Sequence, residues 1–394
     1  MKNQNQFTPK AFVIRYWDRV IKNNLPKPSF ILSKASPLSA ADASSFANYA
    51  SANTLSTKLP EFCSAANLLC SLDINPQSYR KGVDLDKKLS FASYGITHPF
   101  EDYIRKGLLF PIYTKSSSNN SITSLGKNSF RSGMFFREKM LQQGMVMHMP
   151  NIRDKLPERS FLPRSILIKL PFASSKLDEM KQFFKVSKNS SMEKMIVNSL
   201  RECERVPSKG EVKRCVGSLE DMIDFATSIL GSNVTVRSTE NVNGSNKNVM
   251  LSQVRGINHG KVKEFVSCHQ TMFPYLLYYC HSVPKVRVYE ADLLDPQSKV
   301  KINRGVAICH LDTTAWSPTH GAFVALGSGP GRIEKFPRPQ LLRAPPAVYN
   351  FGCTSSGLQF WFATWNYKKS SFFQSSPLEY AHLAMPFHHK VTLF

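Results

Sequence analysis

Acidic residues are scarce in this sequence, and the short motifs that identify common enzyme classes are missing. Asp and Glu number 28 against 51 Lys and Arg, which gives the 394-residue chain a formal net charge of +23. The chain contains no G-x-S-x-G, no P-loop and no H-E-x-x-H, so no serine hydrolase, P-loop nucleotide-binding or zinc protease motif is present. A glycosidase carboxylate pair leaves no sequence spacing and stays open.

Long apolar runs are also absent. No window of eighteen apolar residues occurs, so we expect no transmembrane helix and no membrane partner. The opening MKNQNQF is polar and lacks the apolar segment of a signal peptide. We therefore expect either an intracellular protein or a secreted one whose signal peptide this chain does not include.

The positive charge is spread along the chain, without the long Lys/Arg block that marks a nucleic-acid-binding tail. Its long-range field favours a polyanionic partner. Nucleic acid and an acidic polysaccharide such as pectin are both candidates, and a generally basic surface without such a partner is the alternative. The nucleic-acid interpretation depends on charge alone, so we expect no nucleic-acid partner.

The eight cysteines include no C-x-x-C pair, which argues against a zinc finger. An even number is compatible with disulfides in an oxidising compartment. Cys203 and Cys215 frame a loop before a strong helix pattern, and a disulfide is predicted there, with two reduced buried cysteines as the alternative. Cys63 and Cys70 are close enough for a local disulfide. Four N-x-Ser/Thr sequons also favour secretion as a glycoprotein, at Asn119, Asn189, Asn233 and Asn243.

Three cysteines are each followed directly by histidine, in the pairs Cys268-His269, Cys280-His281 and Cys309-His310. Adjacent side chains of a strand face opposite ways, so each pair places one residue in the core and the other on a second face. FPYLLYY, between the first two pairs, is interpreted as a buried strand. The three imidazoles are candidate ligands for copper or zinc, and core histidines bonded to the backbone are the alternative.

Periodicity predicts an α+β fold with a β-rich C-terminal half. Helix patterns cover residues 12–24, 190–205 and 218–231, and strand patterns cover 164–172, 233–238, 274–280, 285–293, 299–309 and 321–326. Residues 31–127 have a loop-rich composition with Phe-x-x-Tyr at 46–49, 91–94, 100–103 and 110–113, and we expect an extended, partly disordered region. Ordinary aromatic anchors are the alternative. The tail from residue 335 lacks periodicity, and we expect it not to continue the sheet.

The Cys-His spacing resembles the BURP domain of plant secreted proteins. CERVPSKGEVKRC followed by SLEDMIDFA, and FFREKMLQQGMVMHMP, are similar to that family's other signatures, and the N-terminal part with its Phe-x-x-Tyr motifs is similar to the branch of polygalacturonase non-catalytic beta subunits. The resemblance divides the chain into an N-terminal helical segment (1–30), a loop-rich region with remnant repeats (31–127), an incomplete BURP-like domain (128–334) and an atypical tail (335–394). The family's fourth Cys-His pair is replaced by Phe336-Pro337.

What the resemblance implies is a non-catalytic protein of the apoplast and cell wall that modulates pectin metabolism and cell expansion. Its implied partners are the polygalacturonase catalytic subunit, other wall proteins such as expansins, and pectin. No cofactor is expected, although copper is possible. The alternative function is a copper-dependent autocatalytic peptide cyclase that uses the Cys-His motifs, as in other members of the wider family.

Overall fold

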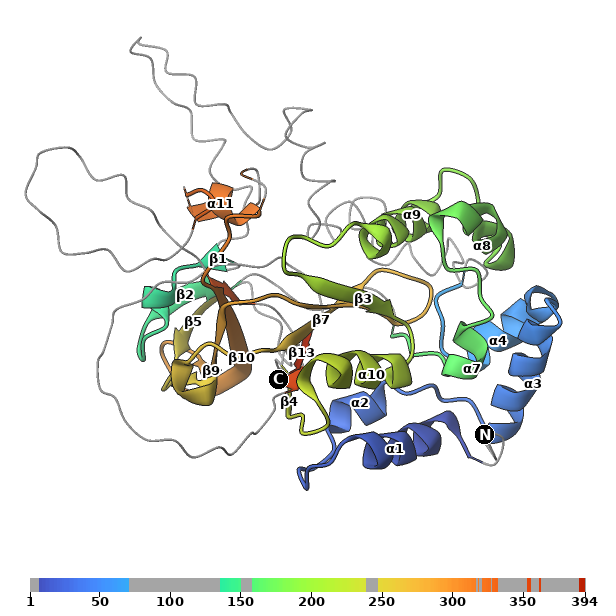
Figure 1. Ribbon diagram of the computed structural model, residues 1–394, viewed down its shortest axis with the longest axis horizontal. Coiled ribbons are helices and arrows are strands. Elements are labelled where there is room, and N and C mark those ends of the chain that lie inside the picture. The colour runs from blue at the N-terminus through green and yellow to red at the C-terminus, as the bar shows by residue number, and fades with distance from the viewer. Residues whose placement is uncertain are drawn as a thin grey trace, which may run out of the picture.

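Two antiparallel β-sheets carry the C-terminal half of the chain, and helices pack around the second of them (Figure 1). The computed structural model describes residues 7–70, 135–149, 158–238, 247–316, 318, 321–326, 328–331, 353–355, 361–362 and 390–393. The predicted α+β class is confirmed, since the described residues form both helices and antiparallel sheets.

The first sheet is built around the hairpin of β9 (Val286–Leu294) and β10 (Lys301–His310). Both faces of the hairpin bury apolar side chains, since Ala307 and Cys309 lie in one cluster and Val306 and Ile308 lie in another. The Asp295 carboxylate accepts hydrogen bonds from the Gln297 and Ser298 backbone in the connecting turn. The strand order is β1 (Phe135–Phe136), β11 (Cys353–Ser355), β10, β9, β5 (Lys247–Leu251) and β2 (Val146–Met149), with β6 (Arg255–Gly256) also on β9.

The second sheet contains the Cys268-His269 and Cys280-His281 pairs. Its order is β3 (Val212–Val216), β8 (Leu277–Ser282), β7 (Val266–Thr271), β13 (Lys390–Leu393) and β4 (Val236–Ser238), with β12 (Trp361–Phe362) also on β7. The interpretation of FPYLLYY as one buried strand is confirmed for its burial, but only its last three residues, from Leu277, belong to a strand. The chain turns back after Thr271 and re-enters the sheet at Leu277, and Pro274 lies in the turn, where no ladder hydrogen bond needs its missing N–H.

The three predicted helices are confirmed, and their ends follow from their capping residues. In α1 (Pro9–Val20) the Thr8 hydroxyl accepts from the Ala11 N–H at 3.2 Å. In α10 (Leu219–Leu230) the Ser218 hydroxyl accepts from Asp221, and Gly231 ends the helix with a φ of 74°. The third helix is α9 (Ser191–Glu204), which Ser190 caps.

Residues 31–70 are more regular than the loop-rich composition suggested. They form the end of α2 (Ser29–Ser33), α3 (Ala40–Ser51), the 3₁₀ turn η2 (Leu55–Lys58) and α4 (Leu59–Ala65). The Ser- and Ala-rich stretch forms a helix because Ala has the highest helix propensity and Ser39 caps α3. The first Phe-x-x-Tyr motif, 46–49, lies in α3, and the other three lie outside the described residues.

Two predicted strands are helices. Residues 164–172 begin with α7 (Arg164–Leu167), and residues 321–326 form α11 (Gly321–Leu326). Short apolar runs do not distinguish a strand from a helix by their period, because a helix of four residues completes barely one turn. The remaining short elements are η5 (Glu138–Met140), η6 (Ser174–Lys176), α8 (Leu177–Phe183) and η7 (Ile257–Gly260).

The described residues form five apolar clusters, and the three largest hold most of these elements together. The first lies between α1, α10 and one face of the second sheet. The second joins α3 and α4 to α8, α9 and the turn between β7 and β8. The third lies on the first sheet. None of the described helices is long and apolar enough to span a membrane.

Short strands from the tail pair with both sheets, although its sequence lacks strand periodicity. β11 pairs with β10, while β12 and β13 pair with β7. The lack of periodicity therefore did not exclude pairing, because two to four residues are too few to display an alternation. That residues 335–394 lie outside the domain stays a prediction.

Candidate functional site: a buried histidine, glutamate and arginine cluster

Disulfides fix the strands and helix ends that surround the site. Cys268 and Cys280 stand directly opposite each other on β7 and β8 and are bridged. Cys203 at the end of α9 is bridged to Cys215 on β3, and a third bridge joins Cys63 to Cys70. Cys309 on β10 is also disulfide-bonded, and the backbone of Cys353 lies directly opposite it.

The register that aligns the cysteines also brings two histidines together on the other face of the sheet. Ser267 faces His281 across the strands, and His269 faces Tyr279. The Nε2 atoms of His269 and His281 are 3.0 Å apart, and the Ser267 hydroxyl lies 3.2 Å from His269 Nε2. His269 is 2% exposed, so the pair is a buried polar contact inside the sheet layer. The predicted alternation of Cys and His faces therefore holds here.

Glu211 connects this pair to the loop that precedes β3. One carboxylate oxygen lies 3.1 Å from His281 Nδ1 and accepts a hydrogen bond from the Tyr279 hydroxyl. The Arg205 guanidinium donates to both oxygens, at 3.0 and 2.9 Å, and also to the Tyr279 hydroxyl at 2.7 Å. The Ser208 backbone N–H donates to the second oxygen at 2.8 Å. We call His269, His281, Glu211, Arg205 and Tyr279 the polar cluster.

The electrostatics of the polar cluster follow from burial opposed by these bonds. Burial acts to raise the pKa of the Glu211 carboxyl, but the hydrogen bonds and charge of its neighbours, His281 first, hold that pKa well below its usual range. Burial, followed by the charge of Glu211, raises the pKa of Tyr279, so its hydroxyl stays a donor. Burial opposes the charge on Arg205, and its anionic neighbours raise its pKa nevertheless.

Glu202 lies beside the cluster, at the end of α9, with a different environment. Its side chain is 5% exposed, and one carboxylate oxygen lies 3.5 Å from Arg205 Nε. Its other oxygen is buried without a hydrogen-bond partner. Burial raises the pKa of Glu202 to about 7, because Arg205 is committed to Glu211 and compensates only in part. The backbone carbonyls of Glu202 and Cys203 accept hydrogen bonds from Lys213 Nζ at 2.7 and 3.2 Å.

The third predicted ligand, His310, lies elsewhere. It is on β10 of the first sheet and packs edge-on against Trp316, with ring centroids 4.9 Å apart. Among the residues that the structure describes, no group of three or more His, Cys, Asp or Glu side chains could hold a metal ion. The structure brings His269 and His281 together but does not add His310, so these residues do not fit the three-histidine copper or zinc site.

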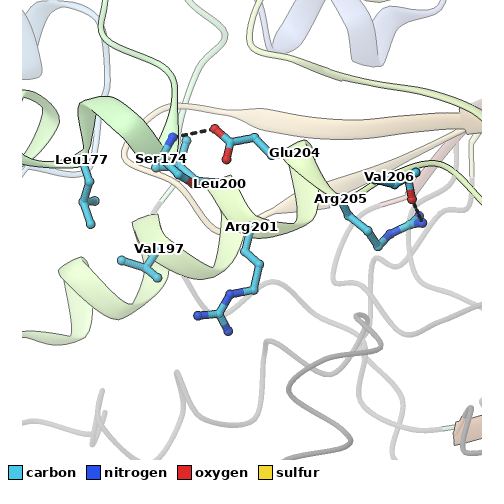
Figure 2. Close-up of a pocket in the computed structure, with 8 residues that line it drawn as sticks. All are labelled: Ser174, Leu177, Val197, Leu200, Arg201, Glu204, Arg205 and Val206. Atoms are coloured by element: carbon cyan, nitrogen blue, oxygen red, sulfur yellow. Dashed lines mark hydrogen bonds between the residues drawn. The ribbon is translucent and has the colours of Figure 1, made fainter.

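A pocket of about 640 Å³ opens next to the polar cluster along α9 (Figure 2). Leu177, Val197 and Leu200 give it apolar walls, and the Glu204 carboxylate accepts from the Ser174 backbone N–H at its edge. Arg205 belongs to both regions, since its guanidinium bonds the Val206 carbonyl at 2.8 Å as well as Glu211. The pocket and the polar cluster therefore share one side chain.

Reasoning from the sequence missed Glu211, Arg205 and Tyr279. The signal that could have found them is the loop CERVPSKGEVKRC, whose charged residues are enclosed by a disulfide and so cannot lie far from the neighbouring strand. Of the sequons, Asn189 is exposed before α9 and Asn233 is partly buried. Asn119 and Asn243 lie outside the described residues.

The fold and the cluster define a class of protein, an α+β domain whose antiparallel sheets are stabilised by disulfides. Residues 134–335 match the family described as BURP domain, and the chain belongs to this family. The resemblance drawn from the Cys-His pairs is therefore confirmed, and the match ends where the atypical tail begins.

Curated relatives refine this result. The chain is 59% identical over 247 residues to "Polygalacturonase-1 non-catalytic subunit beta" of Solanum lycopersicum, covering 61% of this chain and 39% of that protein. It is 57% identical over 245 residues to "Polygalacturonase 1 beta-like protein 3" of Arabidopsis thaliana, covering 61% of this chain and 39% of that protein. It is 44% identical over 324 residues to "BURP domain-containing protein 16" of Oryza sativa subsp. japonica, covering 82% of this chain and 84% of that protein. The chain thus spans about two fifths of the length of the tomato and Arabidopsis relatives.

Proposed function

We propose that this protein is a non-catalytic subunit that associates with a polygalacturonase in the plant cell wall. The observation that carries the proposal is the 59% identity to a tomato protein named as the non-catalytic subunit beta of polygalacturonase-1. The name of that relative states both the partner enzyme and the lack of catalysis. The polar cluster agrees with a structural role, because Glu211 is neutralised by Arg205 within the fold.

Pectin is the second proposed partner. The formal net charge of +23 attracts polyanions, and galacturonate chains carry one carboxylate per unesterified sugar. A protein that holds both the enzyme and its polymer would modulate pectin metabolism and so cell expansion in the apoplast. Other wall proteins, such as expansins, are further candidates within the same compartment.

The proposed function needs no cofactor. A copper ion would be held by imidazoles, and the described residues supply the His269–His281 contact without a third member. Both histidines make polar contacts within the fold, since His281 bonds Glu211 and His269 lies against Ser267. We therefore assign no chemical step to a metal here.

Binding measurements test the proposal. The purified chain is titrated with a polygalacturonase catalytic subunit and, separately, with polygalacturonate, fully methyl-esterified pectin and a nucleic acid of equal charge. We expect a stoichiometric complex with the enzyme and binding to polygalacturonate that exceeds binding to the esterified polymer. Equal binding to polygalacturonate and nucleic acid, with the same steep salt dependence, would show plain electrostatics and remove the pectin assignment. Failure to form a complex with the catalytic subunit would remove the subunit assignment.

A further inference from the structure

The N-terminal segment, residues 8–70, is packed into the same cores as the family domain, although more than sixty residues separate them in the sequence. The family match begins at residue 134. The domain so defined is therefore incomplete without a part of the chain that precedes it.

Apolar contacts make the first connection. Val13 and Trp17 of α1 and Ile21 at its C-cap are 4–5% exposed and lie in one core with α10 and the second sheet, where the Cys268–Cys280 bridge is found. These positions are spaced by four residues, so they form a single stripe along the helix. A domain lacking this helix would expose the matching face of α10 to water.

In the second core, α3 and α4 pack against the domain as α1 does in the first core. Phe46 and Phe62 pack against each other, with ring centroids 5.0 Å apart. The same core holds Phe273 and Tyr275 from the turn between β7 and β8, which are 0% and 1% exposed. This turn connects the two strands that carry His269 and His281, so the N-terminal segment packs against the end of the strand pair that holds the candidate site.

Hydrogen bonds fix the position of the N-terminal segment on the domain. The Tyr16 hydroxyl donates to the Asp224 carboxylate on α10, and the Asn23 amide donates to the Val234 carbonyl at 2.5 Å. Arg164 lies over the Tyr16 ring and is ion-paired with Asp224 at 2.6 Å. These bonds are directional, so they select one docked position over sliding alternatives.

Backbone hydrogen bonds also join the N-terminal segment to the domain, as they do between neighbouring parts of one folded unit. They run from Phe161 N to Lys34 O at 3.0 Å, Ser160 N to Asn67 O at 3.0 Å, Lys22 N to Ser232 O at 2.8 Å and Leu69 N to Pro274 O at 2.7 Å. No disulfide between the two parts exists among the described cysteines, since Cys63 and Cys70 pair with each other.

From these contacts we propose that the surface formed by α10, residues 158–162 and the turn between β7 and β8 is a binding surface for residues 8–70 of the same chain. The two parts stay together as a noncovalent complex when the chain between them is cut. Residues 71–134 then join two halves of one folding unit, and insertions in that connection leave the unit intact.

Cleavage of the full chain tests the proposal. A site for a specific protease, flanked by flexible Gly/Ser linkers, is inserted between Gly126 and Lys127, and the folded protein is cut to completion as judged on a denaturing gel. The fragments are then passed over a size-exclusion column at micromolar concentration. We expect one peak with both fragments in a 1:1 ratio. Two separate peaks would overturn the proposal.

Matched variants on α1 identify the surface. Trp17→Ala removes a buried anchor and should weaken the complex of cleaved fragments by at least about a hundredfold in Kd. Tyr16→Phe keeps the ring but removes its hydrogen bond, and about a tenfold loss is expected. Lys10→Ala, on the exposed side of the same helix, should leave the Kd unchanged. Equal effects of Tyr16→Phe and Lys10→Ala would contradict the docked position even if Trp17→Ala failed to fold.

Discussion

Replacing Glu202 with Gln should remove a large part of the pH dependence of stability between pH 4.5 and 7. Glu202 is buried beside the polar cluster, and its pKa is raised from 4.5 to about 7 by that burial. Gln has nearly the same shape but carries no charge at any pH. The variant therefore separates the cost of the ionised carboxylate from the packing of the side chain.

The magnitude follows from the difference in pKa between the two states. Below pH 4.5 Glu202 is protonated in both the folded and the unfolded chain, and no penalty applies. As the pH rises, the unfolded chain loses its proton first, so the folded state loses stability until the pH passes about 7. At about 1.4 kcal/mol per pH unit, the rise from 4.5 to about 7 corresponds to about 3 kcal/mol.

The assay is guanidinium unfolding of the wild type and Glu202→Gln from pH 4.5 to 8 at constant ionic strength. The difference in free energy of unfolding between them should grow by about 3 kcal/mol across this range, in favour of the variant at high pH. Glu220 serves as the control, because burial raises its pKa to about 6, and Glu220→Gln should yield only about 2 kcal/mol. The pKa of Glu211 is lowered, so the titration of Glu211 affects stability only below the pH range of this assay. Parallel curves for wild type and Glu202→Gln would refute the reasoning.

Three further predictions concern the bridge, the cluster and the sequons. Replacing Cys203 and Cys215 with Ser should lower the free energy of unfolding by about 2–3 kcal/mol, measured by guanidinium unfolding, because an unfolded loop is no longer closed. A loss below about 1 kcal/mol would contradict the bridge as a stabilising element. Glu211→Ala should cost about 3–5 kcal/mol in the same assay, since it leaves the Arg205 charge buried without its carboxylate, and an unchanged midpoint would contradict that role. Asn189→Gln should remove one glycan by mass spectrometry from protein secreted by plant cells, since Asn189 is exposed, and an unchanged mass would exclude that site.

The sequence predicted long strands and capped helices well, because their patterns are repeated over many residues. β9 and β10 span nine and ten residues, and α10 carries both its N-cap serine and its terminal glycine. Short runs were ambiguous. At α7, four residues cannot display a period, and the ion pairs of Arg164 with Asp221 and Asp224 come from a helix distant in the sequence.

The polar cluster could be predicted only in part, for a related reason. The Cys-His alternation places His269 and His281 on one face, which is a local property of strands. Their neighbour Glu211 reaches them only because β3 pairs with β8, in a register that sets Lys213 opposite His281. Pairing of strands separated by more than sixty residues is decided by the whole core, so no local pattern shows it.

The Cys-His dipeptide has a physical use that does not require a metal ion. A bridge between Cys268 and Cys280 fixes two strands in one register, because only directly opposite residues can be joined this way. A slip by one residue would move every side chain to the other face and would separate His269 from His281. The residue after each cysteine is therefore held in position by a covalent bond on the opposite face. The bridge on one face thus keeps the buried contacts of His269, His281 and Glu211 in register on the other, which is a use for the dipeptide in its first two occurrences.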